Sequence, residues 1–113
     1  MVFKREEYER KIVENFRGGA GKAIVDDITK NNPPKCRVFS EITLRPGCEI
    51  GYHKHEHEFE IFYVISGAGT LKEDDVDYII KAGDTICCYD GSSHGVVNTG
   101  IEDLVLLAII MTE

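Results

Sequence analysis

Histidines and carboxylates gather in residues 53–60, which read HKHEHEFE. Side chains two residues apart share a face of an extended backbone, so His53 and His55 direct both imidazoles to one side. Glu60, on the adjoining apolar strand, brings a carboxylate back across a turn at residues 56–58. Two imidazoles and one carboxylate form a facial triad that suits a divalent first-row metal and leaves coordination positions open. Another histidine, His94, stands on a later predicted strand.

The spacing of these residues resembles the two sequence motifs of the cupin superfamily. The first motif reads Gly, five residues, His-x-His, three or four residues, Glu, six residues, Gly. The second reads Gly, five residues, Pro-x-Gly, two residues, His, three residues, Asn. Tyr89 stands where the family usually has proline, and because proline only pre-sets the backbone there, we expect a looser loop rather than a lost ligand. The matching positions are Gly47, His53, His55, Glu60, Gly67, Gly83, Gly91, His94 and Asn98.

This resemblance implies an all-β fold, the double-stranded β-helix or jelly-roll barrel, over about residues 36–111. It implies a divalent iron, manganese, nickel, copper or zinc ion held by His53, His55, Glu60 and His94, and a small organic molecule as ligand or substrate. Similar cupins commonly form homodimers. Apolar residues on both faces of Phe59–Ile65 and Leu104–Ile110 fit a second buried face.

The residues around the predicted ligands are assigned by alternation. His57 belongs to the turn, as a solvated residue or one that supports a ligand, and Glu56 and Glu58 are expected to be exposed. If Glu60 and His94 point into the barrel, then so do Phe62, Val64, Val96 and Asn98. Residues 37–44 allow two registers: Val38, Ser40, Ile42 and Leu44 form the more apolar inner face, but Glu41 as a pocket carboxylate stays open.

The reaction is less constrained than the site. Cupins of this kind include dioxygenases, oxalate-processing enzymes, sugar-phosphate isomerases, sugar-acid lyases and members without known activity, and the fold does not choose among them. An oxygenase-type enzyme is the leading hypothesis; a binding or sensing module, a non-redox isomerase, lyase or decarboxylase, and a purely structural barrel are the alternatives. Basic residues are scarce after Arg37, so a neutral or singly charged ligand is favoured unless a partner subunit supplies Arg5, Arg17 or Lys22.

The elements that must position the site are mostly strands. A chain of 113 residues with 42% hydrophobic residues predicts one domain. Apolar residues at helical spacing predict one short N-terminal helix over residues 3–16, ending at Gly18-Gly19. We divide the chain into a helix and arm at residues 1–35 and a barrel at residues 36–113. Predicted strands cover residues 23–28, 37–44, 59–66, 78–81, 85–89, 95–97 and 104–111.

Charge and cysteine content exclude several classes of partner. Residues 1–37 hold nine Lys/Arg and six Asp/Glu, whereas residues 38–113 hold four and fourteen, for a net charge of −7. An acidic body repels nucleic acid. The N-terminal charges are interpreted as a solvated mixed-charge helix, with a basic arm lying on an acidic barrel as the alternative. No membrane span or secretory signal is seen and the four cysteines are expected to be free, which predicts a cytoplasmic protein; a structural role is favoured for Cys87 and Cys88.

Overall fold

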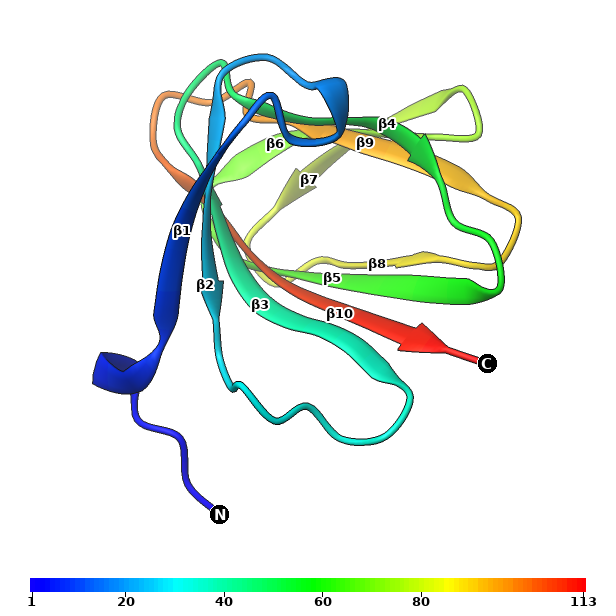
Figure 1. The fold of residues 1–113 in the computed structure, drawn as a ribbon. Coiled ribbons are helices and arrows are strands. Elements are labelled where there is room, and N and C mark those ends of the chain that lie inside the picture. The colour runs from blue at the N-terminus through cyan, green and yellow to red at the C-terminus, as the bar shows by residue number, and fades with distance from the viewer.

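Ten strands form two antiparallel sheets in the computed structural model, which describes residues 1–113 (Figure 1). The larger sheet has the strand order β1-β2-β3-β10-β5-β8, and the smaller sheet has the order β4-β9-β6-β7. The strands are β1 (Glu9–Glu14), β2 (Lys22–Asp27), β3 (Cys36–Leu44), β4 (Glu49–Lys54), β5 (Glu58–Ser66), β6 (Ala68–Glu73), β7 (Val76–Lys81), β8 (Thr85–Cys88), β9 (Ser93–Val97) and β10 (Leu104–Thr112).

The hydrophobic core lies between the two sheets and follows strict alternation along the strands. On β10 every second residue is buried, from Leu104 through Leu106 and Ala108 to Ile110. Antiparallel pairing places β10 between β3 and β5, so its inner side chains meet those of both neighbours. The predicted all-β jelly-roll class is confirmed. The side chains expected to point inward, namely Phe62, Val64, Val96 and Asn98, are all buried.

The two registers left open for residues 37–44 are resolved on β3. Ser40, Ile42 and Leu44 are buried in the barrel. Glu41 points to the other side of the sheet, where both of its oxygens accept hydrogen bonds from the guanidinium of Arg5 at 3.2 and 3.0 Å. Glu41 is therefore not a pocket carboxylate.

The predicted N-terminal helix over residues 3–16 is wrong. Only single 3-10 turns form, η1 (Arg5–Glu7) and η2 (Phe16–Gly18), and β1 between them pairs with β2 over six residues. An isolated helix of this length is marginal in water, whereas β1 completes a sheet edge and gains cross-strand ion pairs. Arg10 contacts Asp26 at 2.8 Å and Lys11 contacts Asp27 at 3.3 Å. These two pairs join strands within residues 1–35, and Arg5 alone of the three cations reaches the predicted barrel, at Glu41.

Besides β1, two further strands were not predicted, β4 and β6. Residues 49–54 carry only one aliphatic residue, Ile50, and residues 68–73 begin with Ala68-Gly69, which is typical of a turn. Both strands nevertheless pair with β9. Glycine permits close approach here, because a side chain at Gly69 would lie 2.7 Å from the carbonyl oxygen of Val97. The missed β4 matters because it carries His53.

All four cysteines are free, as predicted. Cys88 is fully buried and Cys87 is half-buried on the same strand, β8, so the pair alternates across the sheet. Burial raises the pKa of the Cys88 thiol to about 12. No helix of the chain is long and apolar enough to cross a membrane. The cytoplasmic location stays a prediction.

Candidate metal centre

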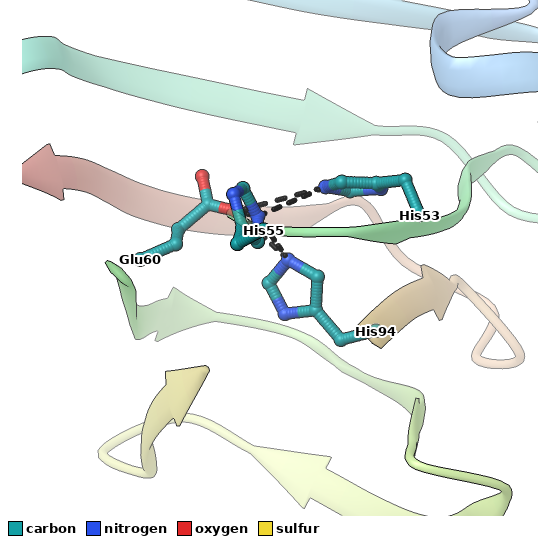
Figure 2. A group of neighbouring side chains, drawn as sticks. All are labelled: His53, His55, Glu60 and His94. Atoms are coloured by element: carbon teal, nitrogen blue, oxygen red, sulfur yellow. Dashed lines mark hydrogen bonds and ion pairs between the residues drawn. The ribbon is translucent and has the colours of Figure 1, made fainter. Parts of the chain in front are cut away.

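The four predicted ligands come together inside the barrel (Figure 2). His53 lies near the end of β4 and pairs across the small sheet with His94 on β9, while Glu60 reaches in from β5 of the large sheet. His55 lies just beyond β4, in the loop that leads to β5. Its backbone is tied to the β8–β9 loop, since its N–H donates to the carbonyl of Ser92 and its carbonyl accepts from Gly91. The site therefore joins both sheets at one end of the barrel.

The spacing of the donor atoms fits a single ion. The Nε2 atom of His55 lies 3.1 Å from that of His53, 3.0 Å from that of His94 and 3.0 Å from Oε1 of Glu60. Ligand atoms bound at about 2.1 Å and at right angles to one another are separated by about 3.0 Å. All four donor atoms lie within 4.8 Å of one another, and three of the four residues are buried. Nitrogen and carboxylate donors in this set suit a divalent transition metal.

Hydrogen bonds at Nδ1 of His53 and of His55 orient both rings, so that each Nε2 faces the other ligand atoms. Nδ1 of His53 lies 2.7 Å from the carbonyl oxygen of Gly51, and Nδ1 of His55 lies 2.5 Å from Oε2 of Glu58. A carbonyl and a carboxylate only accept, so each Nδ1 carries the hydrogen and each Nε2 is free to bind a metal. His94 has no partner at Nδ1, and its ring stacks on Phe62 with centroids 5.0 Å apart.

Burial and the neighbouring charges shift the titration of the site. Burial lowers the pKa of His53 to about 4, which keeps this imidazole neutral. The hydrogen bond to Glu60 raises the pKa of His55 above its usual range. Burial alone would raise the pKa of Glu60, but the hydrogen bonds from His55 and His94 together hold it below its ordinary value. The carboxylate of Glu60 is thus charged and ready to offset the charge of a cation.

The residues around the ligands were only partly predicted. His57 lies in the turn with a positive φ of 61° and is exposed, and Glu56 is exposed as expected. Glu58 is different: its side chain is only 13% exposed, and it contacts both His55 and the guanidinium of Arg37. The prediction of an exposed Glu58 is therefore wrong. The i, i+3 spacing of His55 and Glu58 across the turn was the available signal.

A cavity of about 370 Å³ opens onto the ligands. Its lining includes His53 and Glu60, an apolar wall that contains Phe62, and three cationic side chains, Lys11, Arg17 and Arg37. The expectation that one chain lacks cations near the pocket is therefore wrong. It failed because β1 pairs with β2 and η2 lies against β4 (Figure 1). These two elements carry Lys11 and Arg17, which line the cavity.

The fold and the site together define a cupin. The family model described as "Cupin domain" matches residues 40–110, and the chain belongs to this family. The chain is 38% identical to a protein named "Oxalate-binding protein" from Thermotoga maritima, over 98% of this chain and 93% of the relative. It is also 38% identical to Auxin-binding protein 1 of Arabidopsis thaliana, over 60% of this chain and 38% of the relative.

Solved structures show the same relationship. A crystal structure described as a predicted oxalate decarboxylase from Thermotoga maritima superposes with a TM-score of 0.95, at 37% identity and with both chains fully covered. The structure of KdgF from Halomonas sp. has a TM-score of 0.79 at 18% identity, covers 100% of this chain and 94% of that chain, and shows the shared fold alone.

Proposed function

We propose that this cupin binds a small dicarboxylate of the oxalate class at a divalent metal ion held by His53, His55, Glu60 and His94. A metal with these four ligands keeps two coordination positions that a chelating dicarboxylate can occupy. The name of the Thermotoga relative, identical at 38% of positions over almost the whole chain, points to the same class of ligand. The remaining support comes from the charges around the cavity.

The single observation that carries the proposal is Arg17. Lys11 and Arg37 each face a carboxylate, Asp27 at 3.3 Å and Glu58 at 2.9 Å, but Arg17 lines the cavity and forms no ion pair. An arginine presents a planar fork of N–H donors that matches a carboxylate. Arg17 is therefore the free cation that recognises the part of the ligand not neutralised by the metal.

Binding without turnover is the form of this function that the cavity supports best. Its lining contains only two carboxylates, Asp27 and Glu60. Asp27 is held by Lys11 and by the hydroxyl of Ser40, which donates a hydrogen bond of 2.7 Å, and Glu60 belongs to the ligand set. Neither carboxylate is free to move a proton to or from a bound molecule, as general acid–base catalysis requires.

The test uses protein stripped of metal with a chelator, then loaded with Co(II) or left empty, in calorimetric titrations with oxalate, malonate and acetate. We expect oxalate to bind only the loaded protein, and acetate to bind far more weakly. Losing a charged hydrogen bond of about 1.5–3 kcal/mol in Arg17→Gln should weaken oxalate binding roughly 10- to 100-fold. Arg45→Gln, at an exposed arginine outside the cavity, is the matched control. An oxalate affinity that is the same with and without metal, and the same in wild type and Arg17→Gln, would refute the proposal.

An oxygenase-type activity on a small organic molecule is the second candidate. The observation that favours it is the apolar share of the cavity, where eight of fifteen lining residues are hydrophobic. An apolar wall suits a carbon skeleton better than it suits oxalate. Oxygen consumption by the iron-loaded protein, followed with an oxygen electrode over a panel of phenols, thiols and organic acids, decides between the two. Uptake that disappears on chelation would favour the oxygenase over the binding protein.

We further propose that two copies pair through the outer face of the large sheet. On this face Ile109 of β10 lies between Phe39 of β3 and Ile61 of β5, and all three are half-buried in the single chain. The apolar centre of this sheet face calls for a cover, and a patch centred on Ile109 can pair with its own copy about a two-fold axis. Sedimentation should show a dimer that Ile109→Glu converts to a folded monomer. A monomeric wild-type protein would contradict this pairing.

A further inference from the structure

The side chain that orients His55 is not one of the metal ligands. His53 and His94 sit on paired strands that fix their directions, but His55 lies beyond the end of β4. Contacts with Ser92 and Gly91 fix only its backbone. Its ring is fixed by Glu58, whose Oε2 accepts a hydrogen bond of 2.5 Å from Nδ1.

Glu58 is itself held from a second direction. The guanidinium of Arg37 donates two parallel hydrogen bonds of 2.9 Å, one to each carboxylate oxygen. Such a bidentate pair fixes the plane of the carboxylate as well as its position. Arg37 lies near the start of β3 and Glu58 starts β5, on opposite sides of β10, so the pair spans the sheet at the end where the metal ligands meet.

We propose that Glu58, clamped by Arg37, is a positioning residue that presents Nε2 of His55 to the metal. The hydrogen on Nδ1 leaves a lone pair on Nε2, and that atom is the one donor within 3.1 Å of all three other ligand atoms. His55 therefore lies close to every other ligand atom, and rotating its ring would remove all three of these contacts. The inference rests on the metal-binding part of the proposed function and is independent of the identity of the small molecule.

A carboxylate behind a metal-bound histidine typically raises metal affinity by about 10- to 100-fold. Glu58→Ala removes both the charge and the acceptor, so we expect the dissociation constant for Co(II) to rise by about that factor. Glu58→Gln keeps an oxygen that accepts from Nδ1 and loses only the charge, so it should recover part of the affinity. Arg37→Met leaves Glu58 in place but unclamped and should cause a smaller loss than Glu58→Ala.

The titration follows the visible absorption of Co(II) added to metal-free protein, without oxalate. Asp26→Asn is the matched control, because Asp26 accepts an equivalent bidentate pair from Arg10 at 2.8 and 3.0 Å, outside the cavity lining. Thermal unfolding of each metal-free variant separates a loss of fold from a loss of ligand geometry. The inference predicts that only the Glu58 and Arg37 variants change Co(II) affinity and the absorption spectrum.

A double-mutant cycle decides whether Glu58 acts through His55. If it does, adding Glu58→Ala to a His55→Ala protein causes no further loss of Co(II) affinity. Equal, additive losses in both backgrounds would overturn the inference and assign Glu58 a purely structural role. A wild-type protein that binds no Co(II) would instead overturn the metal site and with it the proposed function. Wild-type Co(II) binding without oxalate binding would leave the role of Glu58 intact and refute only the ligand.

Discussion

Replacing Gly51 by alanine should push Arg17 away from the cavity. Gly51 is buried on β4, two residues before His53, and η2 passes directly over it. A Cβ atom at this position would lie 2.0 Å from the carbonyl oxygen of Arg17 and 2.7 Å from the backbone nitrogen of Gly19. These are backbone atoms that cannot rotate away. Since β4 is held in its sheet by β9, η2 must move outward by about 1 Å, a form of overpacking that costs about 1–3 kcal/mol.

The assay compares oxalate affinity, Co(II) affinity and urea unfolding of Gly51→Ala with those of wild type. We expect a loss of about 1–3 kcal/mol in the free energy of unfolding. Oxalate binding should weaken roughly 10- to 100-fold, because the charged hydrogen bond from Arg17 is lost. Co(II) affinity should be retained, because the ligands are not displaced.

The matched control is Gly83→Ala. Gly83 has a φ of +93° and nothing within 4 Å of an added Cβ, so alanine there strains only the local backbone, at about 1–2 kcal/mol. This variant should unfold more easily and bind oxalate like wild type. Wild-type oxalate affinity in Gly51→Ala, or an equal loss in Gly83→Ala, would refute the reasoning that η2 delivers Arg17 to the ligand.

Three further outcomes are expected. Phe62→Ala, at a ring that is 1% exposed and stacked on His94, should lower the free energy of unfolding by about 3–5 kcal/mol in urea titrations; a loss below 1 kcal/mol would contradict the packing. His55 has a raised pKa in the metal-free protein and His53 one of about 4, so protons compete with the metal mainly at His55. The Co(II) dissociation constant should therefore begin to rise above the ordinary imidazole value of about 6.5 and increase about tenfold per pH unit once the pH is below the raised pKa of His55. Constant affinity from pH 8 to 5 would contradict this. Cys88 is buried and has a pKa of about 12, so it should resist iodoacetamide at pH 8 in the native protein while the half-buried cysteines react. Mass spectrometry measures the labelling of each cysteine, and rapid labelling of Cys88 would contradict its burial.

The clustering of His53, His55 and Glu60 could be predicted from the sequence because local spacing encodes it. His53 and His55 are two residues apart, and Glu60 follows across a single turn, so the consecutive strands β4 and β5 of the two sheets bring them together. His94 lies far along the chain, and only the resemblance to a known motif placed it with the others. The barrel was predictable for a related reason, since alternation along each strand reports burial directly. β4 was missed because Ile50 is its single aliphatic residue, so the sequence shows no apolar alternation there.

The N-terminal segment could not be predicted in the same way. The apolar residues of residues 3–16 fit a helical period. A strand was predicted over residues 23–28, but nothing local reveals that its Asp26 and Asp27 pair with Arg10 and Lys11. The role of Glu58 was hidden for the same reason, since Arg37 lies 21 residues away. In both cases a charged residue that looks solvated in the sequence has a partner supplied by tertiary structure.

The residues that match the family and the cationic residues of the cavity lie in different parts of the chain. The family model covers residues 40–110, which contain all four metal ligands and Glu58. The cationic side chains of the cavity, Lys11, Arg17 and Arg37, all precede residue 40. Matching the family therefore supports the cluster of candidate ligands, whereas the proposed recognition of an anion depends on residues outside the matched region. The Thermotoga oxalate-binding relative matches over 98% of this chain, whereas the Arabidopsis auxin-binding relative matches over only 60%. The proposed ligand class therefore draws on the Thermotoga relative, whose match spans almost the whole chain, and not on the shorter match.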